Sequence, residues 1–82
     1  MNILFSVPVF AQNKSRMIEM FETLSHFPNI IMMLKNGENT VDAHSLMGFF
    51  AIDESLPMEL ILESEPDDSF MQAISKFSPA IV

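Results

Sequence analysis

Residues 29–52 read NIIMMLKNGENTVDAHSLMGFFAI, and the predicted fold is organised around this stretch. A short apolar run over 29–35 is followed by Asn36-Gly37, a strong signal for a reverse turn, and NTVDA can return as the second strand of a hairpin. The next residues, HSLMGFFAI, predict a short helix that ends before Pro57. The centre of the chain is therefore a β-hairpin followed by a helix.

The residues upstream of the hairpin predict one strand and one helix. Residues 3–10 show the two-residue period of a strand with one buried side, formed by Ile3, Phe5, Val7 and Val9. Pro8 cannot donate to a sheet ladder, which places this strand at a sheet edge. From Ser15 the apolar spacing changes to i, i+3, i+4, i+7, which predicts a helix ending before Pro28.

The residues downstream complete a mixed fold. Residues 58–64, MELILES, resume the alternation and predict a central strand, and a third helix is expected to begin at Asp67 or Asp68 and to stop at Pro79. The order βαββαβα predicts a single α+β domain over 1–82, an open-faced two-layer sandwich. It has a four-stranded antiparallel sheet, three helices on one face and a solvated far face.

Charge and composition exclude several classes of partner and chemistry. Four Lys and Arg against eleven Asp and Glu give a net charge of −7, which repels nucleic acids and anionic membranes. The chain has no Cys, which excludes disulfides and thiol chemistry and agrees with a reducing compartment. No basic region precedes the N-terminal apolar run, which Pro8 interrupts, and no stretch is long enough to cross a bilayer. A cytoplasmic protein is expected.

The segment HSLMG after an NG turn resembles the KSIMG or KSLF segment of HPr, the histidine-containing phosphocarrier family of the bacterial sugar phosphotransferase system. The predicted element order agrees with that family over nearly the whole chain. Residue identity is confined mainly to one segment, with two further residues in register on the first helix: Ser45, Leu46, Met47 and Gly48, then Arg16 and Phe21. The resemblance implies an HPr-like fold and a role connected with sugar transport or carbon catabolite regulation.

The family's active loop reads G-L-H-x-R-P-A, and its histidine carries a phosphoryl group. In the register set by Phe21, Lys14 occupies the histidine position, Arg16 matches the arginine and Met17 replaces the proline. Another register places Asn13 there. Asparagine has no nucleophilic nitrogen, and a lysine ammonium does not act as a carrier of this type. Phosphotransfer by a histidine in this loop is therefore expected to be lost, and neither His26 nor His44 aligns with the position.

Two features of the second helix each have two interpretations. Ser45 matches the family's regulatory serine, which a dedicated kinase phosphorylates in some bacteria, but Ser is also a preferred N-cap whatever its function. The helix has more apolar residues than one side can bury, so some should be exposed. The resemblance implies that Leu46, Met47 and Phe50 correspond to the family's partner-docking patch. The alternative is that most of this cluster belongs to the core.

The remaining polar residues give weaker signals. Lys14, Ser15 and Arg16 lie at a loop-to-helix junction that could contact an anion, although Ser15 is also an ordinary cap candidate. His26 and His44 lack the spacing of a zinc site. The acidic residues lack the spacing of a calcium loop and are expected to form a solvated face: Asp53, Glu54, Glu63, Glu65, Asp67 and Asp68. No metal or cofactor is expected, and the absence of catalytic motifs argues against an enzyme.

Three functional hypotheses follow. The first is a non-catalytic HPr-like protein that acts through protein contacts at Leu46, Met47 and Phe50, with Ser45 as a switch. The second is an atypical phosphocarrier that uses another residue, such as His44. The third is a ferredoxin-like module that binds a small ligand. A homodimer is also open, because edge strands can pair between copies.

Overall fold

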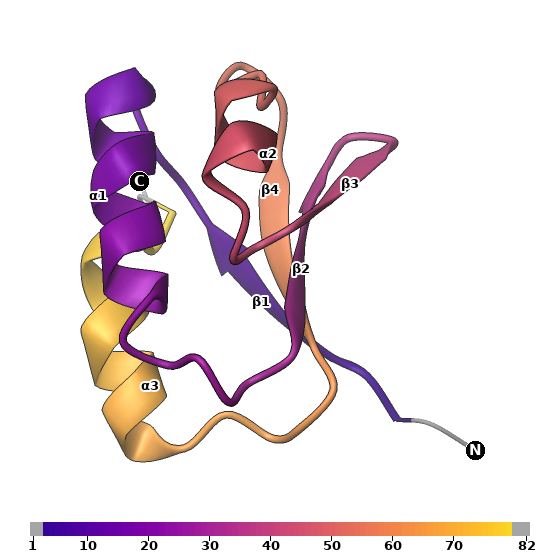
Figure 1. The fold of residues 1–82 in the computed structure, drawn as a ribbon, viewed down its shortest axis with the longest axis vertical. Coiled ribbons are helices and arrows are strands. Elements are labelled where there is room, and N and C mark those ends of the chain that lie inside the picture. Colours follow the sequence, from indigo (N-terminus) through magenta and orange to yellow (C-terminus); the bar gives the residue numbers. More distant parts are fainter. Residues whose placement is uncertain (1–2, 80–82) are drawn as a thin grey trace.

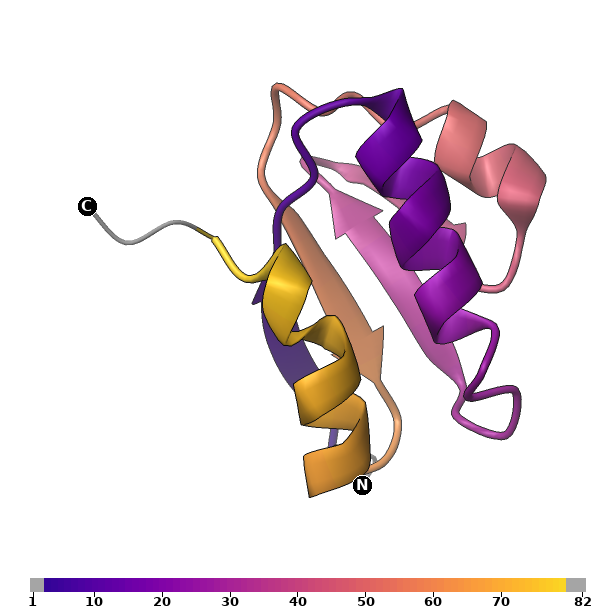
Figure 2. The same cartoon turned by 90° about the vertical axis from the view of Figure 1, so that its left-hand side faces the viewer.

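A four-stranded sheet lies behind one layer of three helices (Figures 1 and 2). The computed structural model describes residues 3–79, so both ends of the predicted domain, 1–2 and 80–82, lie outside the described residues. The elements, in order, are β1 (Phe5–Val9), α1 (Lys14–Leu24), β2 (Met32–Asn36), β3 (Asn39–Asp42), α2 (Leu46–Phe50), β4 (Met58–Leu62), α3 (Asp68–Ile74) and a 3-10 turn, η1 (Ser75–Phe77). The predicted α+β order is confirmed.

The sheet has the strand order β1-β4-β2-β3, and all neighbouring strands are antiparallel. The prediction that 58–64 contains a central strand is confirmed, because β4 pairs with both β1 and β2. Pro8 lies in β1 at one edge, as predicted, where a missing N–H is tolerated. Hairpin strand β3 forms the other edge. This order brings the first and last strands together in space.

The hairpin turn lies one residue later than the sequence predicts. Asn36 is the last residue of β2 and pairs with Asn39, so the loop consists of Gly37 and Glu38 and not of Asn36-Gly37. Gly37 has φ +61° and is the only described residue with a positive φ, which is the pattern of a two-residue turn with glycine in its first position. The shift arises because the Asn36 side chain is buried and bonded inside the protein.

The hydrophobic core lies between the sheet and the helices. Every second residue of β1, β2 and β4 points toward it, β3 adds only the partly buried Val41, and each helix contributes apolar residues from one side. Two edge-to-face aromatic pairs join the layers, Phe21 with Phe49 and Phe27 with Phe70. The largest fully buried apolar side chains are Phe49, Phe70, Phe77, Met17, Met20, Leu24, Met32, Leu34, Leu60, Leu62 and Ile74.

Side-chain caps define where the helices begin. Ser45 caps α2 and Asp67 caps α3, as the sequence predicts. The predicted cap of the first helix is wrong: Asn13 and not Ser15 caps α1, because its Oδ1 accepts from the Arg16 amide over 2.9 Å. Asparagine is as good a cap as serine, so the helix begins at the earlier of two competent residues.

Candidate functional site

Three apolar side chains of α2 face solvent beside the helix cap. Leu46, Met47 and Phe50 are 41%, 78% and 53% exposed, whereas Phe49 and Ile52 are buried. A helix of five residues can turn only one side to the core, and Phe49 occupies that side. We call Leu46, Met47 and Phe50 the α2 patch. Its exposure is what a docking surface requires, and docking itself stays a prediction.

Contacts from α1 hold α2 in place. The rings of Phe21 and Phe49 meet edge to face with centroids 5.3 Å apart. The Lys14 ammonium donates hydrogen bonds to the carbonyl oxygens of Phe50 and Ile52, at the end of α2. A cation at this end of a helix satisfies carbonyls that have no partner inside the helix. The α2 patch is thus presented by a fixed element.

Ile18 of α1 extends the exposed apolar surface. It lies four residues after Lys14 and three before Phe21, and both of those side chains contact α2. Residues at these spacings share one helix face, so Ile18 faces α2 and is partly exposed. Sequence reasoning missed this residue. The available signal was that Ile18 is apolar but falls outside the buried stripe of its helix.

Ser45 has the geometry of an N-cap. Its Oγ accepts from the Gly48 amide over 3.1 Å, and its carbonyl accepts from the Phe49 amide over 3.2 Å. The side chain is partly buried between the hairpin and the α2 patch. Capping is therefore confirmed, and regulatory phosphorylation of this serine stays a prediction.

Asn13 and Lys14, the two residues predicted at the position of the HPr histidine, have structural partners. Asn13 caps α1. Lys14 forms an ion pair with Glu54 over 3.5 Å in addition to its bonds with α2. Ser15 lies exposed in the first turn of α1. Asn13 therefore defines the start of α1, and Lys14 joins α1 to α2 and the loop after it.

Arg16 points to a different part of the molecule from Lys14. Its guanidinium pairs with Glu19 over 2.7 Å, donates to the Lys76 carbonyl over 2.9 Å and lies 4.7 Å from the centre of the Phe77 ring. An anion bound over 14–16 would compete with these partners for the two cations. Anion binding here stays a prediction that the observed contacts do not favour.

The two histidines lie in different settings. His26 is exposed in the turn after α1. In His44, Nε2 is 2.9 Å from the Ile30 carbonyl and the backbone amide donates to the Asp42 carboxylate over 2.8 Å. A carbonyl only accepts, so Nε2 carries the proton and Nδ1 is the unprotonated nitrogen of the neutral ring.

The acidic residues have local structural roles. The Asp53 carboxylate accepts from the Ser55 hydroxyl and amide, and these hydrogen bonds, with a smaller attraction from Lys14, lower the pKa of Asp53. Asp67 accepts from the Phe70 amide. Among residues 3–79, no three side chains of His, Asp or Glu gather as a metal ion would require.

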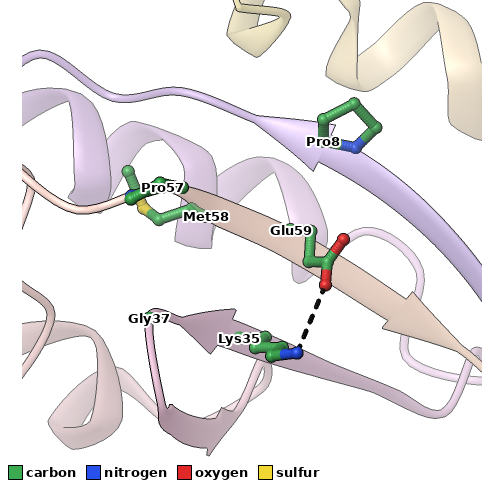
Figure 3. Close-up of a pocket in the computed structure, with 6 residues that line it drawn as sticks. All are labelled: Pro8, Lys35, Gly37, Pro57, Met58 and Glu59. Atoms are coloured by element: carbon green, nitrogen blue, oxygen red, sulfur yellow. Dashed lines mark ion pairs between the residues drawn. The ribbon is translucent and has the colours of Figure 1, made fainter.

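An open hollow of about 360 Å³ lies on the face of the sheet away from the helices (Figure 3). The Glu59 carboxylate in it lies 3.8 Å from the Lys35 ammonium and accepts from the Ser6 hydroxyl. Its polar groups therefore satisfy one another. Sequence reasoning missed the hollow, which depends on strand register. It is lined by Pro8, Lys35, Gly37, Pro57, Met58 and Glu59.

Comparison with protein-family models, curated proteins and solved structures finds no match to the chain. Within the part of the chain that the structure describes, no helix has the length and apolarity to cross a membrane. A functional proposal for this chain rests on its own geometry, above all on the exposed apolar side chains of the α2 patch.

Proposed function

We propose that this chain is a cytoplasmic, HPr-like regulatory or interaction protein that acts through contacts between its α2 patch and other proteins. Its role would belong to the sugar phosphotransferase system or to carbon catabolite regulation. In this proposal the protein does not transfer a phosphoryl group through a histidine in the family's active loop. It excludes nucleic acids and membranes as partners because of the net charge of −7.

The observation that carries the proposal is the exposure of Leu46, Met47 and Phe50 on one short, fixed helix. Apolar surface that a partner covers contributes about 25 cal/mol per Å² to association. Met and Phe are also adaptable contact residues, enriched at protein interfaces. Because α2 is already held by Lys14 and Phe21, little ordering of the helix would oppose binding.

The absence of a histidine before α1 supports a regulatory role over a carrier role. Asn13 and Lys14 stand at the two candidate positions, and each makes contacts that hold α1 or α2. Neither side chain offers the chemistry of a phosphohistidine.

Ser45 is the switch in this proposal. A phosphate on its Oγ would add a charge of about −1.5 to −2 beside Leu46 and Met47. It would also replace the capping bond to the Gly48 amide. Phosphorylation would therefore weaken docking of an apolar partner and favour a partner that supplies arginine.

The test uses intact-mass analysis after incubation with HPr kinase and ATP, and separately with the first enzyme of the phosphotransferase system and phosphoenolpyruvate. We expect one phosphate in the kinase arm, lost in Ser45→Ala, and none in the phosphoenolpyruvate arm. Phe50→Ser should lower the rate of modification and the affinity for the kinase. Met71→Ser, an exposed methionine on α3, is the matched control.

Two outcomes would overturn the proposal. Absence of phosphate in both arms, together with absence of binding to either enzyme by calorimetry, would remove the connection with this system. Acid-labile phosphate in the phosphoenolpyruvate arm, abolished by His44→Gln, would favour the atypical carrier. The supporting observation is the 2.9 Å distance from His44 Nε2 to the Ile30 carbonyl, which leaves Nδ1 free of this contact.

A further inference from the structure

The face of the sheet away from the helices is apolar at one end. Met33 and Ile61 are register partners, and Ser6 lies opposite Ile61 on the other side. Ile31 precedes Met33 by two residues and Leu4 precedes Ser6 by two, so all four apolar side chains lie on this face. Leu4, Ile31 and Met33 are 58%, 63% and 37% exposed, and Ile61 is partly exposed. We call Leu4, Ile31, Met33 and Ile61 the sheet patch.

The sheet patch lies where β1 and β2 begin and β4 ends (Figure 1). The Glu63 amide donates to the Ile31 carbonyl over 3.2 Å, which continues the pairing of β4 with β2 beyond Leu62. Lys35 and Glu59 form an ion pair two residues along from Met33 and Ile61 on the same face, and the Ser6 hydroxyl donates to Glu59. The predicted solvated far face therefore carries exposed apolar side chains at one end, next to this polar group.

The charge beside the sheet patch is negative and uncompensated. All four Lys and Arg side chains of the chain pair with glutamates: Lys14 with Glu54, Arg16 and Lys76 with Glu19, and Lys35, on the same face two residues after Met33, with Glu59. Asp42 lies opposite Met33, and Glu63, two residues after Ile61 on the same face, lies between Ile31 and Leu4 when the pairing of Leu62 with Met32 and Phe5 is continued by one residue. Both are exposed and, among residues 3–79, neither has an ion pair. Three further acids follow Glu63 before or at the start of α3: Glu65, Asp67 and Asp68.

Exposed apolar side chains with unpaired acids beside them favour one kind of partner over a second copy of the chain or an added strand. A second copy would bring the same acids together at a net charge of −7 per chain. Strand addition uses the edge of a sheet and not its face. The patch spans β1, β4 and β2, a width of about 10 Å at ordinary strand spacing, which matches the diameter of an α-helix.

We propose that the sheet patch docks a basic amphipathic helix of a partner protein, with apolar side chains over Leu4, Ile31, Met33 and Ile61 and Lys or Arg facing Glu63 and Asp42. This surface is separate from the α2 patch, which lies on the helical side of the molecule. The proposal therefore stands or falls independently of the HPr-like function.

The test uses a fluorescein-labelled helical peptide of about 18 residues, with Leu at i, i+3, i+4, i+7 and Lys elsewhere. Its control has the same composition in permuted order. Anisotropy measures affinity for the full chain, and amide NMR shifts locate the contact. We expect binding of the ordered peptide to perturb β1, β2 and the end of β4. Ile31→Ser should weaken it about tenfold, as burial of one large apolar side chain implies.

Matched variants separate this surface from general attraction. Met47→Ser, on the α2 patch, should leave the affinity for the peptide unchanged. If Ile31→Ser unfolds the chain, Leu4→Ser takes its place and should weaken binding by a similar factor. Glu63→Gln should reduce the salt dependence of binding, whereas Glu38→Gln in the hairpin loop at the opposite end of the sheet should not.

Three results would overturn the proposal. Equal binding of the permuted peptide would show that charge alone attracts it. Shifts confined to α2 would assign the peptide to the α2 patch. If the natural chain sediments as a dimer and Ile31→Ser sediments as a monomer, a second copy covers this face.

Discussion

The side-chain amide of Asn36 makes two hydrogen bonds with the backbone of Asp53. Its Nδ2 donates to the Asp53 carbonyl and its Oδ1 accepts from the Asp53 amide, each over 2.9 Å. Asn36 is 1% exposed and is the one buried polar residue among those the structure describes. The pair joins the end of β2 to the loop between α2 and β4, and so helps to position the end of the helix that carries the α2 patch.

Replacing this amide should destabilise the protein. We expect Asn36→Ala to lower the free energy of unfolding by about 1–3 kcal/mol, because it leaves backbone groups of Asp53 without their protein partner and empties a buried position. Urea unfolding followed by circular dichroism measures the change. Asn39→Ala, at an exposed position opposite Asn36, is the control. An equal effect of both variants would contradict a special role for Asn36.

Gly48 should resist substitution because β3 lies close to α2. A Cβ at this position would lie 3.0 Å from Val41 Cβ and 3.3 Å from Val41 Cγ2. Gly→Ala inside a helix ordinarily stabilises it by about 0.5–1 kcal/mol. We expect Gly48→Ala to lose this gain in the natural chain and to recover it when Val41→Gly, which removes both of these Val41 carbons, is also present. A double-mutant cycle by urea unfolding measures the coupling, and additive effects would show that no clash exists.

Lys14 should contribute to stability through its bonds to the end of α2. Lys14→Met keeps most of the aliphatic stem but removes the donors to Phe50 and Ile52. We expect a loss of about 0.5–1.5 kcal/mol, limited by the exposure of the ammonium. Lys35→Met, which removes only the surface pair with Glu59, should cost less than about 0.5 kcal/mol. Hydrogen exchange of the Phe49 amide should accelerate only in the Lys14 variant.

The lowered pKa of Asp53 should make stability depend on pH. Because the folded pKa lies below the unfolded one, the stability that this carboxylate contributes is complete above its ordinary pKa and is lost as pH falls through the folded value. Asp53→Asn should therefore have a lower Tm than the natural chain at about pH 6, with a gap that closes below about pH 4.

The cause of this pH dependence can be tested separately. Ser55→Ala removes the hydroxyl that contributes most to lowering the pKa of Asp53. In this background the Tm difference produced by Asp53→Asn should shrink at pH 6. A gap of unchanged size would assign the pH dependence to another group.

Local sequence patterns account for the elements that were predicted correctly. The two-residue periods near 3–10 and 58–64, the helical stripe before Pro28 and the caps at Ser45 and Asp67 depend on residues that are close in sequence. The two local errors have a common form. By residue type, Asn36 suits a turn and Ser15 suits a helix cap. In the structure the turn is formed by Gly37 and Glu38, and the cap is Asn13.

The two proposed docking surfaces depend on contacts between residues that are distant in sequence. Sequence alone left open whether the apolar cluster after Ser45 was core or surface, because a five-residue helix can turn any of its sides inward. Packing of Phe49 against Phe21 resolved this and left Met47 and Phe50 outside. Likewise, Lys14 and Arg16 are near neighbours in sequence, yet their partners lie on opposite sides of α1.

The sequence by itself determined the order of strands and helices, the edge position of the first strand and the acidic balance of the chain. Only the tertiary structure placed Leu4 and Ile31 beside Glu63, since these residues flank three different strands. Their proximity follows from the order β1-β4-β2-β3. Periodicity reports which side of its own strand a residue occupies, whereas adjacency between strands is settled by the packing of the whole core.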